Sequence, residues 1–424
     1  MKIKVTDLPL EEVLKLQPEK RFAPTKIDYF WYTLVRALVP FEVNDKTLNL
    51  KKVDMDKLGK NQPCLILQNH TSFLDPKITQ KVMYPRPINI VTTYDAFVGL
   101  KWVLRKLGCF PTRKFVPEVQ TLKDMAYCVN TLKTSVVMFP EAGYNFDGTT
   151  TTLPENLGRL VKLLGVPLVT IISKGADLIQ PLFNRLLKRK VRFETEVKFQ
   201  LSTKQIQEMS AEEITKVIND AFSYDSYKWQ QENNVIIDET NRALGLERVL
   251  YKCPHCNAEE QTVGENSTLT CKACGKQWEL TETGYMKALD GETEFSHIPD
   301  WFNWERECVR TQLESGEYLA QTEVDLYAQI NTKTIYKTGE AILTQNMDGL
   351  FLHDKQGNLI HHQPPLFSHT INADFYWYEI DDIIGLGTEK IYYTCAPKNH
   401  RNFVTKARLV AEELYKLKKI KEQK

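Results

Sequence analysis

The fold is decided by one stretch of sequence, CLILQNHTSFLD, at residues 64–75. Its first four residues are apolar, and a polar segment follows that contains His70 and, five positions later, Asp75. A short apolar run bounded by polar residues is typical of a buried strand. If that strand continues into a turn and a helix, the imidazole and the carboxylate can meet at the carboxyl end of a sheet.

A histidine beside an aspartate suits general-base catalysis. Imidazole titrates near neutrality and can take a proton from a hydroxyl, while the carboxylate fixes its tautomer and stabilises the imidazolium that forms. In the purely structural alternative, Ser72 or Asp75 caps a helix and His70 is incidental. His70 is the only histidine in the first 254 residues, so a histidine base in this part of the chain has to be His70.

The flanking sequence predicts an α/β domain over residues 1–240. Apolar runs predict strands at 88–92, 135–139, 168–172 and 197–201, and amphipathic stretches between them predict helices at 97–107, 120–132 and 156–164. Such alternation is typical of a mainly parallel sheet flanked by helices. A helix at 211–222 is expected to close the domain, and the polar stretch 229–240 is expected to be a linker.

Three further segments carry candidate binding residues. VVMFPEAG at 136–143 predicts a strand that ends in a turn, where Glu141 and the backbone of Gly143 can hold a polar ligand. GCFPTR at 108–113 places Arg113 at a strand edge, where a guanidinium can bind a phosphate. GVPLVT at 165–170 is interpreted as a structural turn before a buried strand.

These four segments, in this order, resemble the glycerophospholipid acyltransferase superfamily, and most closely the 1-acylglycerol-3-phosphate acyltransferases. Members carry N-H-x4-D, G-x-x-x-x-R-like, F-P-E-G and V-P-[IL]-[VI] blocks, which correspond here to residues 69–75, 108–113, 139–143 and 166–169. The resemblance covers about residues 50–200.

The resemblance implies an acyltransferase of phospholipid biosynthesis. His70 would deprotonate the hydroxyl of the acceptor, which would attack the thioester of acyl-CoA or acyl carrier protein, and Asp75 would orient the imidazole. Lysophosphatidic acid (1-acylglycerol-3-phosphate) is the leading acceptor, and no metal would take part in the chemistry. The resemblance implies that Arg113 and Glu141 bind the glycerol and phosphate end of the acceptor. The full set of residues implied in substrate binding is Asn69, Arg113, Glu141 and Gly143.

Two departures from the family pattern affect the acceptor. Ala142 follows Glu141, and residues 143–145 bring no positive charge where the family has an arginine. Asn156 stands where the family tends to place a lysine, two residues before a glycine. Basic side chains expected around the acceptor are therefore missing. The alternative function is a catalytically weak lipid- or protein-binding scaffold on an acyltransferase fold.

A second motif predicts a zinc ribbon over residues 249–281. Cys253, Cys256, Cys271 and Cys274 form two C-x-x-C pairs with 14 residues between them. Two such turns complete a tetrahedral Zn²⁺ site, and four thiolates leave no open coordination position, so the metal is expected to be structural. Glutamates offset the lysines of this segment, which argues against nucleic acid as a partner.

Charge and hydropathy suggest where the protein works. Residues 1–200 carry 31 Lys and Arg against 19 Asp and Glu, which favours an anionic partner. No apolar run reaches the roughly 18–20 residues of a membrane span, and the N-terminus does not resemble a signal peptide. We therefore expect a cytoplasmic protein that is peripheral on the cytoplasmic face of an anionic membrane. Amphipathic stretches at 29–43, 95–107 and 178–192 are the candidate contacts.

The remaining residues, 282–424, are expected to form a β-rich domain. Strands are predicted at 340–344, 349–353, 375–380 and 389–396, followed by an amphipathic helix at about 402–418. By element order alone, this part resembles a pleckstrin-homology-like module.

Overall fold

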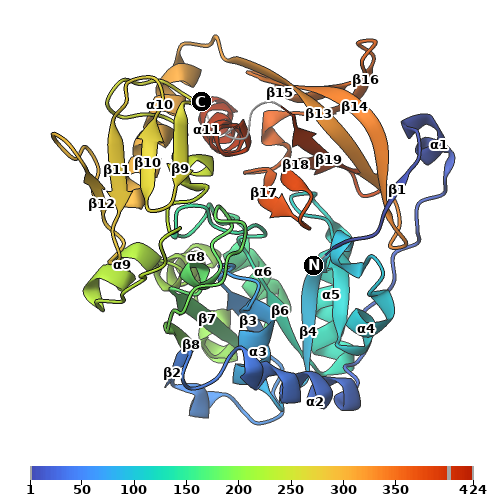
Figure 1. Ribbon diagram of the computed structural model, residues 1–424. Helices are drawn as coiled ribbons and strands as arrows, with labels where there is room; N and C mark the ends of the chain where they lie inside the picture. The colour runs from blue at the N-terminus through green and yellow to red at the C-terminus, as the bar shows by residue number, and fades with distance from the viewer. Residues whose placement is uncertain (1, 399–402, 423–424) are drawn as a thin grey trace.

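The structure is a computed structural model that describes residues 2–398 and 403–422. Its lower half in Figure 1 is a seven-stranded mixed sheet of order β2-β8-β7-β3-β6-β4-β5. The five strands from β7 to β5 are parallel, whereas β8 is antiparallel to β7 and β2 is parallel to β8. The strands are β2 Leu48–Val53, β3 Leu65–Gln68, β4 Ile88–Thr93, β5 Cys109–Thr112, β6 Ser135–Met138, β7 Leu168–Lys174 and β8 Phe193–Leu201.

Helices cover both faces of this sheet. Successive residues of β3 point to opposite sides: Ile66 joins the core under α3, and Leu65 and Leu67 join the core under α5, α6 and α8. The expected α/β architecture is thus observed. The helices of this part are α2 Tyr29–Leu38, α3 Asp75–Met83, α4 Lys101–Lys106, α5 Val119–Tyr127, α6 Leu157–Leu164, α7 Thr203–Glu208, α8 Ala211–Ala221 and α9 Ser226–Glu232.

The expected linker at 229–240 begins inside α9. Gln230 is buried and donates to the carbonyl oxygens of Val235 and Glu282, and the Trp229 ring lies against Gly175. Polar composition suggested a linker, but these side chains tie the sheet to the segment that follows.

A four-stranded antiparallel sheet, of order β12-β11-β10-β9, follows at the upper left of Figure 1. Its strands are β9 Thr262–Glu265, β10 Thr268–Cys271, β11 Gln277–Leu280 and β12 Met286–Ala288. Trp278 of β11 packs edge-on against Trp301 of α10 (Ile298–Glu314), with ring centroids 5.0 Å apart. This contact joins the small sheet to the C-terminal part.

The C-terminal part is a β-rich sheet followed by α11 (Phe403–Glu422). The antiparallel order is β16-β15-β14-β13-β19-β18-β17. Residue 402, where the sequence places the start of the helix, lies outside the described residues. The strands are β13 Leu319–Gln329, β14 Ile335–Asn346, β15 Gly349–His353, β16 Leu359–Gln363, β17 Asn372–Trp377, β18 Asp381–Gly387 and β19 Tyr392–Pro397.

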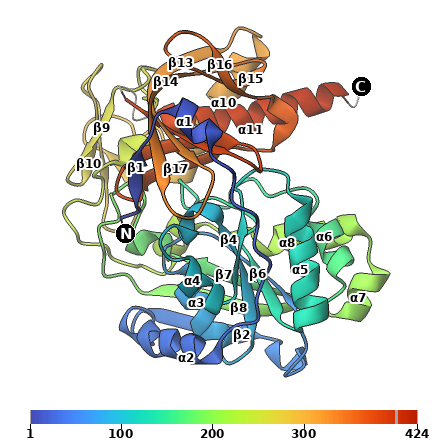
Figure 2. The same ribbon diagram turned by 90° about the vertical axis from the view of Figure 1, so that its right-hand side faces the viewer.

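The N-terminus belongs to this C-terminal sheet. β1 (Val5–Asp7) pairs in parallel with β14, and both views show it at the edge of the C-terminal sheet, followed by α1 (Leu10–Lys15) (Figures 1 and 2). The expected unit 1–240 is therefore incorrect at its start. A three-residue exposed strand has no hydrophobic pattern of its own, so only its distant partner reveals it.

The C-terminal part lies over the carboxyl ends of the parallel strands. Phe146, in the loop after β6, stacks on Phe375 of β17 with ring centroids 4.1 Å apart. Arg408 of α11 donates to the carbonyl oxygen of Tyr144 at 3.0 Å, and Trp377 donates to Asp95 at 3.1 Å. Any chemistry at the ends of β3 and β6 therefore takes place at the contact between the two sheets.

Candidate active site

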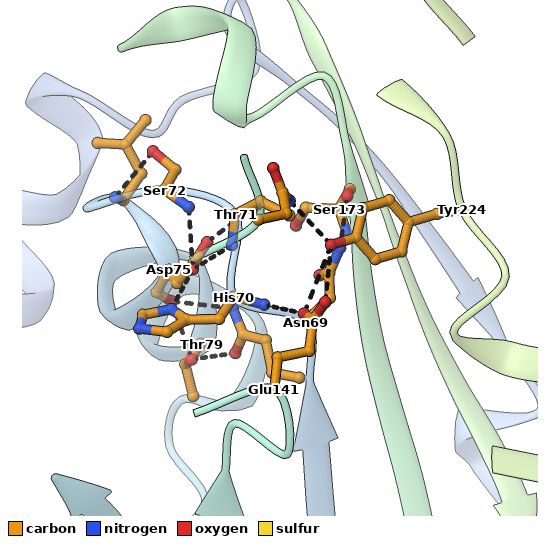
Figure 3. Close-up of polar contacts among 12 residues, drawn as sticks. Asn69, His70, Thr71, Ser72, Asp75, Thr79, Glu141, Ser173 and Tyr224 are labelled. Carbon is orange, nitrogen blue, oxygen red and sulfur yellow. Dashed lines mark hydrogen bonds and ion pairs between the residues drawn. The ribbon is translucent and has the colours of Figure 1, made fainter. Parts of the chain in front are cut away.

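His70 and Asp75 meet as the sequence predicts. The imidazole Nδ1 and the Asp75 Oδ2 are 2.9 Å apart, at the point where β3 ends and α3 begins (Figure 3). The Asp75 carboxylate is fully buried and also accepts the backbone N–H groups of Thr71 and Ser72, at 2.9 and 3.1 Å. The loop that carries the histidine is thus wrapped around the carboxylate.

This arrangement favours a neutral imidazole with a free Nε2. A carboxylate at Nδ1 holds the proton there, so Nε2 carries the lone pair. No residue in the described ranges makes a hydrogen bond to Nε2, and the side chain is 15% exposed. Burial lowers the pKa of His70, the hydrogen bond with Asp75 opposes this, and the charge of Lys114 lowers the pKa further. The ring is therefore unprotonated at neutral pH and can accept a proton.

Two aromatic rings pack against the imidazole. The centroids of Phe139 and Tyr144 lie 4.6 and 4.0 Å from that of His70. Phe73, which is half exposed, lies 5.1 Å from Tyr144. These contacts restrict the imidazole to one orientation and make its surroundings largely apolar.

Glu141 lies in the site, where its carboxyl accepts hydrogen bonds from other groups of the protein. Its Oε2 accepts the backbone N–H of His70 at 2.7 Å, and its Oε1 accepts the N–H of Thr151 at 2.9 Å and the hydroxyl of Tyr224 at 3.1 Å (Figure 3). The carboxyl is fully buried, which raises its pKa to about 7 against the opposing effect of these donors. In this structure the Glu141 carboxyl is bonded within the protein, and its contact with an acceptor stays a prediction.

Asn69 and Gly143 are likewise engaged within the protein. The Asn69 amide is fully buried and makes two 2.8 Å hydrogen bonds with the backbone of Ser173, which ties β3 to β7. The N–H of Gly143 donates to the carbonyl oxygen of Glu141 in a tight turn, at 2.6 Å. Both contacts shape the loops, and the substrate-binding roles expected of Asn69 and Gly143 stay predictions.

Arg113 is covered by the C-terminal sheet. Its side chain is 6% exposed, donates from Nε to the carbonyl oxygen of Glu389 at 3.1 Å and lies over the Tyr94 ring at 4.5 Å. It lines a small cavity together with Asp95 and Lys114, and its Nη1 has no hydrogen-bond partner among the described residues. Sequence reasoning could not anticipate this, because Glu389 lies 276 residues away.

The four cysteines form a separate site. Their sulfur atoms lie within 4.8 Å of one another, and the pairs Cys253–Cys274 and Cys256–Cys271 are 3.8 Å apart. Four sulfurs at about 2.3 Å from a tetrahedral Zn²⁺ are separated by about 3.8 Å. Asn257 and Gly275, which each follow a C-x-x-C pair, share a left-handed backbone conformation, so the two turns are alike. The group therefore fits a metal ion held by thiolates.

One family model matches the part of the chain that contains the four sequence blocks. Residues 49–174 match the sequence model of the family described as Acyltransferase, so this part of the chain is an acyltransferase-family domain. Among solved structures, the chain is similar to the 1-acyl-sn-glycerophosphate acyltransferase PlsC from Thermotoga maritima, with 13% sequence identity and a TM-score of 0.34, over 45% of this chain and 76% of that one. A search of curated proteins finds no significant match.

Three residues near this site were missed by the sequence analysis. They are Tyr144 on the imidazole, Lys114, whose ammonium lies 5.9 Å from the centre of the Tyr144 ring, and Asp374 of β17, whose neighbour Phe375 stacks on Phe146. Lys114 directly follows the Arg113 block and was a detectable signal. Nothing in the sequence indicated that Asp374, from the distant C-terminal part, would approach the same loop.

Proposed function

We propose that this protein transfers a fatty acyl group from acyl-CoA or acyl carrier protein to a hydroxyl of a glycerolipid. The observation that carries the proposal is the His70 imidazole, whose Nδ1 is held by Asp75 while Nε2 has no hydrogen-bond partner in the part of the chain that the structure describes. Nε2 takes the proton of the acceptor hydroxyl as its oxygen bonds to the acyl carbon. The carbon–sulfur bond then breaks, and the proton passes from His70 to the leaving thiolate.

Asp75 and Glu141 support this role by holding His70. Asp75 fixes the tautomer and stabilises the transient imidazolium. Glu141 holds the His70 backbone and, through Thr151, the loop that follows the F-P-E block. Lysophosphatidic acid is the leading acceptor, because the block pattern is closest to its acyltransferases.

The test is an acceptor screen with the purified full-length chain and isotope-labelled acyl-CoA or acyl carrier protein, read by lipid mass spectrometry. We expect a labelled diacyl product from lysophosphatidic acid or a related lysolipid. Tight lipid binding without turnover on any acceptor would instead support the alternative, a scaffold on an acyltransferase fold.

We propose that the enzyme docks on a membrane through α2 and α4. Among the described residues, no helix has both the length and the apolar character to span a bilayer. Trp31 of α2 packs against Trp102 of α4 at 5.1 Å, and Phe30, Phe41 and Trp102 are 70%, 81% and 59% exposed. Arg36, Lys101 and Arg105 lie on the same two helices. Exposed aromatic groups with basic neighbours suit an anionic interface on the cytoplasmic face.

The third candidate segment, 178–192, is different. Leu182 and Phe183 are buried, and Arg189 is buried with its guanidinium bonded to the carbonyl oxygen of Arg242. These apolar residues belong to the core, so the segment is excluded from the proposed membrane contact.

We further propose a structural Zn²⁺ at the four cysteines and a pleckstrin-homology-like fold for the C-terminal part. Numbered within that part, the strand order is 4-3-2-1-7-6-5, with a helix after the last strand. An antiparallel sheet of this order that ends in a helix supports the second proposal.

A further inference from the structure

Tyr144 packs on the imidazole of the proposed base, and its hydroxyl is unpaired among the described residues. The side chain is 9% exposed, and its ring centroid lies 4.0 Å from that of His70. Within residues 2–398 and 403–422, no group makes a hydrogen bond with this hydroxyl. A buried tyrosine hydroxyl usually has a hydrogen-bond partner. This one is therefore a donor that is available to a ligand beside His70.

The surrounding loops hold the Tyr144 ring in place. Glu141, three residues earlier, anchors the loop after β6 to the backbone of His70. The carbonyl oxygen of Tyr144 accepts a hydrogen bond from Arg408 of α11 at 3.0 Å, and the Phe73 ring lies against the tyrosine ring with centroids 5.1 Å apart. A donor on a ring that is already held needs little reorganisation when charge develops beside it.

Acyl transfer from a thioester requires such a donor. The carbonyl oxygen becomes an oxyanion when the acceptor oxygen bonds to the acyl carbon. Backbone N–H groups often stabilise such an oxyanion, but those of residues 70–72 and 142–143 are engaged within the protein. They donate to the carboxylates of Asp75 and Glu141 or to carbonyl oxygens of the F-P-E block. The Tyr144 hydroxyl is a donor of these loops that the described residues leave unused.

The Tyr144 hydroxyl stays protonated. Burial raises the pKa of Tyr144 well above its usual value. The carboxylates of Asp75, Asp374 and Asp95 raise it further. The hydroxyl is therefore neutral at neutral pH and can donate a hydrogen bond without giving up its proton, whereas His70 is the group that accepts one.

We propose that the Tyr144 hydroxyl donates a hydrogen bond to the carbonyl oxygen of the acyl thioester and stabilises the oxyanion that forms during the transfer. The inference rests on the proposed function and adds a catalytic residue to it. As the acceptor oxygen bonds to the acyl carbon, the carbonyl π electrons move to the carbonyl oxygen, and its hydrogen bond with Tyr144 strengthens. When the carbon–sulfur bond breaks, the carbonyl forms again and the thiolate takes the proton held by His70.

Tyr144→Phe tests the hydroxyl alone, because the ring that packs on His70 remains. In steady-state assays of the full-length protein with labelled acyl-CoA and lysophosphatidic acid, kcat should fall about 10²-fold, as after the loss of one oxyanion donor. KM for each substrate should stay within about twofold. Tyr127→Phe, at an exposed tyrosine of α5, is the matched control and should keep the wild-type kcat. A wild-type kcat in Tyr144→Phe would overturn the inference.

The pH dependence separates a lost hydrogen bond from disturbed packing. Burial lowers the pKa of His70, so a variant that uncovers the imidazole should move the ascending limb of the pH–rate profile to higher pH. Tyr144→Leu, which removes the ring, is expected to do so. In Tyr144→Phe the limb should stay at its wild-type position. A limb that moves upward in Tyr144→Phe would show a packing role and overturn the inference.

The infrared carbonyl stretch of a bound thioester tests the contact without turnover. Carbon-13-labelled acyl-CoA, bound in the absence of an acceptor, should show a lower carbonyl frequency in the wild type than in Tyr144→Phe, because a hydrogen bond weakens the carbonyl bond. Equal frequencies, or no binding of the thioester, would overturn the inference. A lower frequency that depends on Tyr144, in a wild-type protein that acylates no acceptor, would support the contact and contradict only the proposed function.

Discussion

Glu141 accepts the backbone N–H of His70 at 2.7 Å, so the carboxylate expected to meet a substrate holds the histidine in place. The same carboxylate accepts the N–H of Thr151 and the hydroxyl of Tyr224. It therefore joins the loop after β3, the loop after β6 and the segment after α8 at one buried point. Through this contact, which we call the clamp, the F-P-E block fixes the backbone of the N-H-x4-D block.

Glu141→Gln should weaken this clamp. Each carboxylate oxygen of Glu141 accepts a backbone N–H. A glutamine has only one acceptor oxygen, so its NH₂ group would face one of these N–H donors and could not bond to it. We expect a loss of about 1–3 kcal/mol in the free energy of unfolding, and a fall in kcat with little change in KM. Urea denaturation and steady-state kinetics measure the two effects. A variant of wild-type stability and activity would show that the clamp is dispensable.

The pH dependence of stability offers an independent check on Glu141. Burial raises its pKa to about 7, above the ordinary value of 4.5, so the folded state favours the protonated form. The contribution to stability is full below pH 4.5 and is lost as the pH rises through about 7. The stability difference between wild type and Glu141→Gln, measured at several pH values, should shrink over this range. A difference that grows with pH would contradict the sign.

Asp75→Asn should leave the fold intact and reduce kcat by about 10³–10⁴-fold, because an amide no longer holds the proton on Nδ1. Acyl transfer to lysophosphatidic acid measures the change, and circular dichroism checks the fold. Asp354→Asn, at an exposed turn of the C-terminal sheet, is a suitable control. Activity within tenfold of wild type would show that the carboxylate does not orient the base.

The sequence predicts the His70–Asp75 contact because both residues lie in one short segment whose strand-to-helix turn brings them together. The cysteine cluster is predictable for the same reason, since each C-x-x-C pair is a local turn. The burial of Asn69, Arg113 and Glu141 among distant partners could not be predicted from the sequence. Their partners Ser173, Glu389 and Tyr224 lie 104, 276 and 83 residues away, and burial of a polar side chain depends on such distant segments.

The cysteine site should hold one Zn²⁺ per chain. Replacing Cys253 and Cys256 by serine should remove the metal and unfold β9–β12, since binding and folding are coupled in small thiolate sites. Metal analysis and the fluorescence of Trp278, which is buried against Trp301, follow the loss. Cys308→Ser is the control, because this partly buried cysteine lies outside the cluster. Undamaged protein without stoichiometric zinc would contradict the assignment.

Membrane association should depend on the aromatic residues of α2 and η1 (Val39–Phe41). Phe30→Ser combined with Phe41→Ser should reduce flotation with anionic vesicles at least about tenfold, since each phenyl group loses its apolar burial. Added salt should weaken wild-type binding through screening. Leu163→Ser, at an exposed leucine of α6, controls for loss of apolar surface elsewhere. Equal effects of both replacements would exclude α2 as the docking surface.

The central claim is that His70 acts as the general base, and His70→Ala tests it most directly. In a single-turnover assay with labelled acyl-CoA and saturating acceptor, we expect the rate to fall at least about 10³-fold. His362→Ala, which removes an exposed histidine of β16, should retain the wild-type rate. The ascending limb of the wild-type pH–rate profile should lie below pH 6.5, because burial lowers the pKa of His70. A folded His70→Ala protein that retains a tenth or more of the wild-type rate would contradict the account.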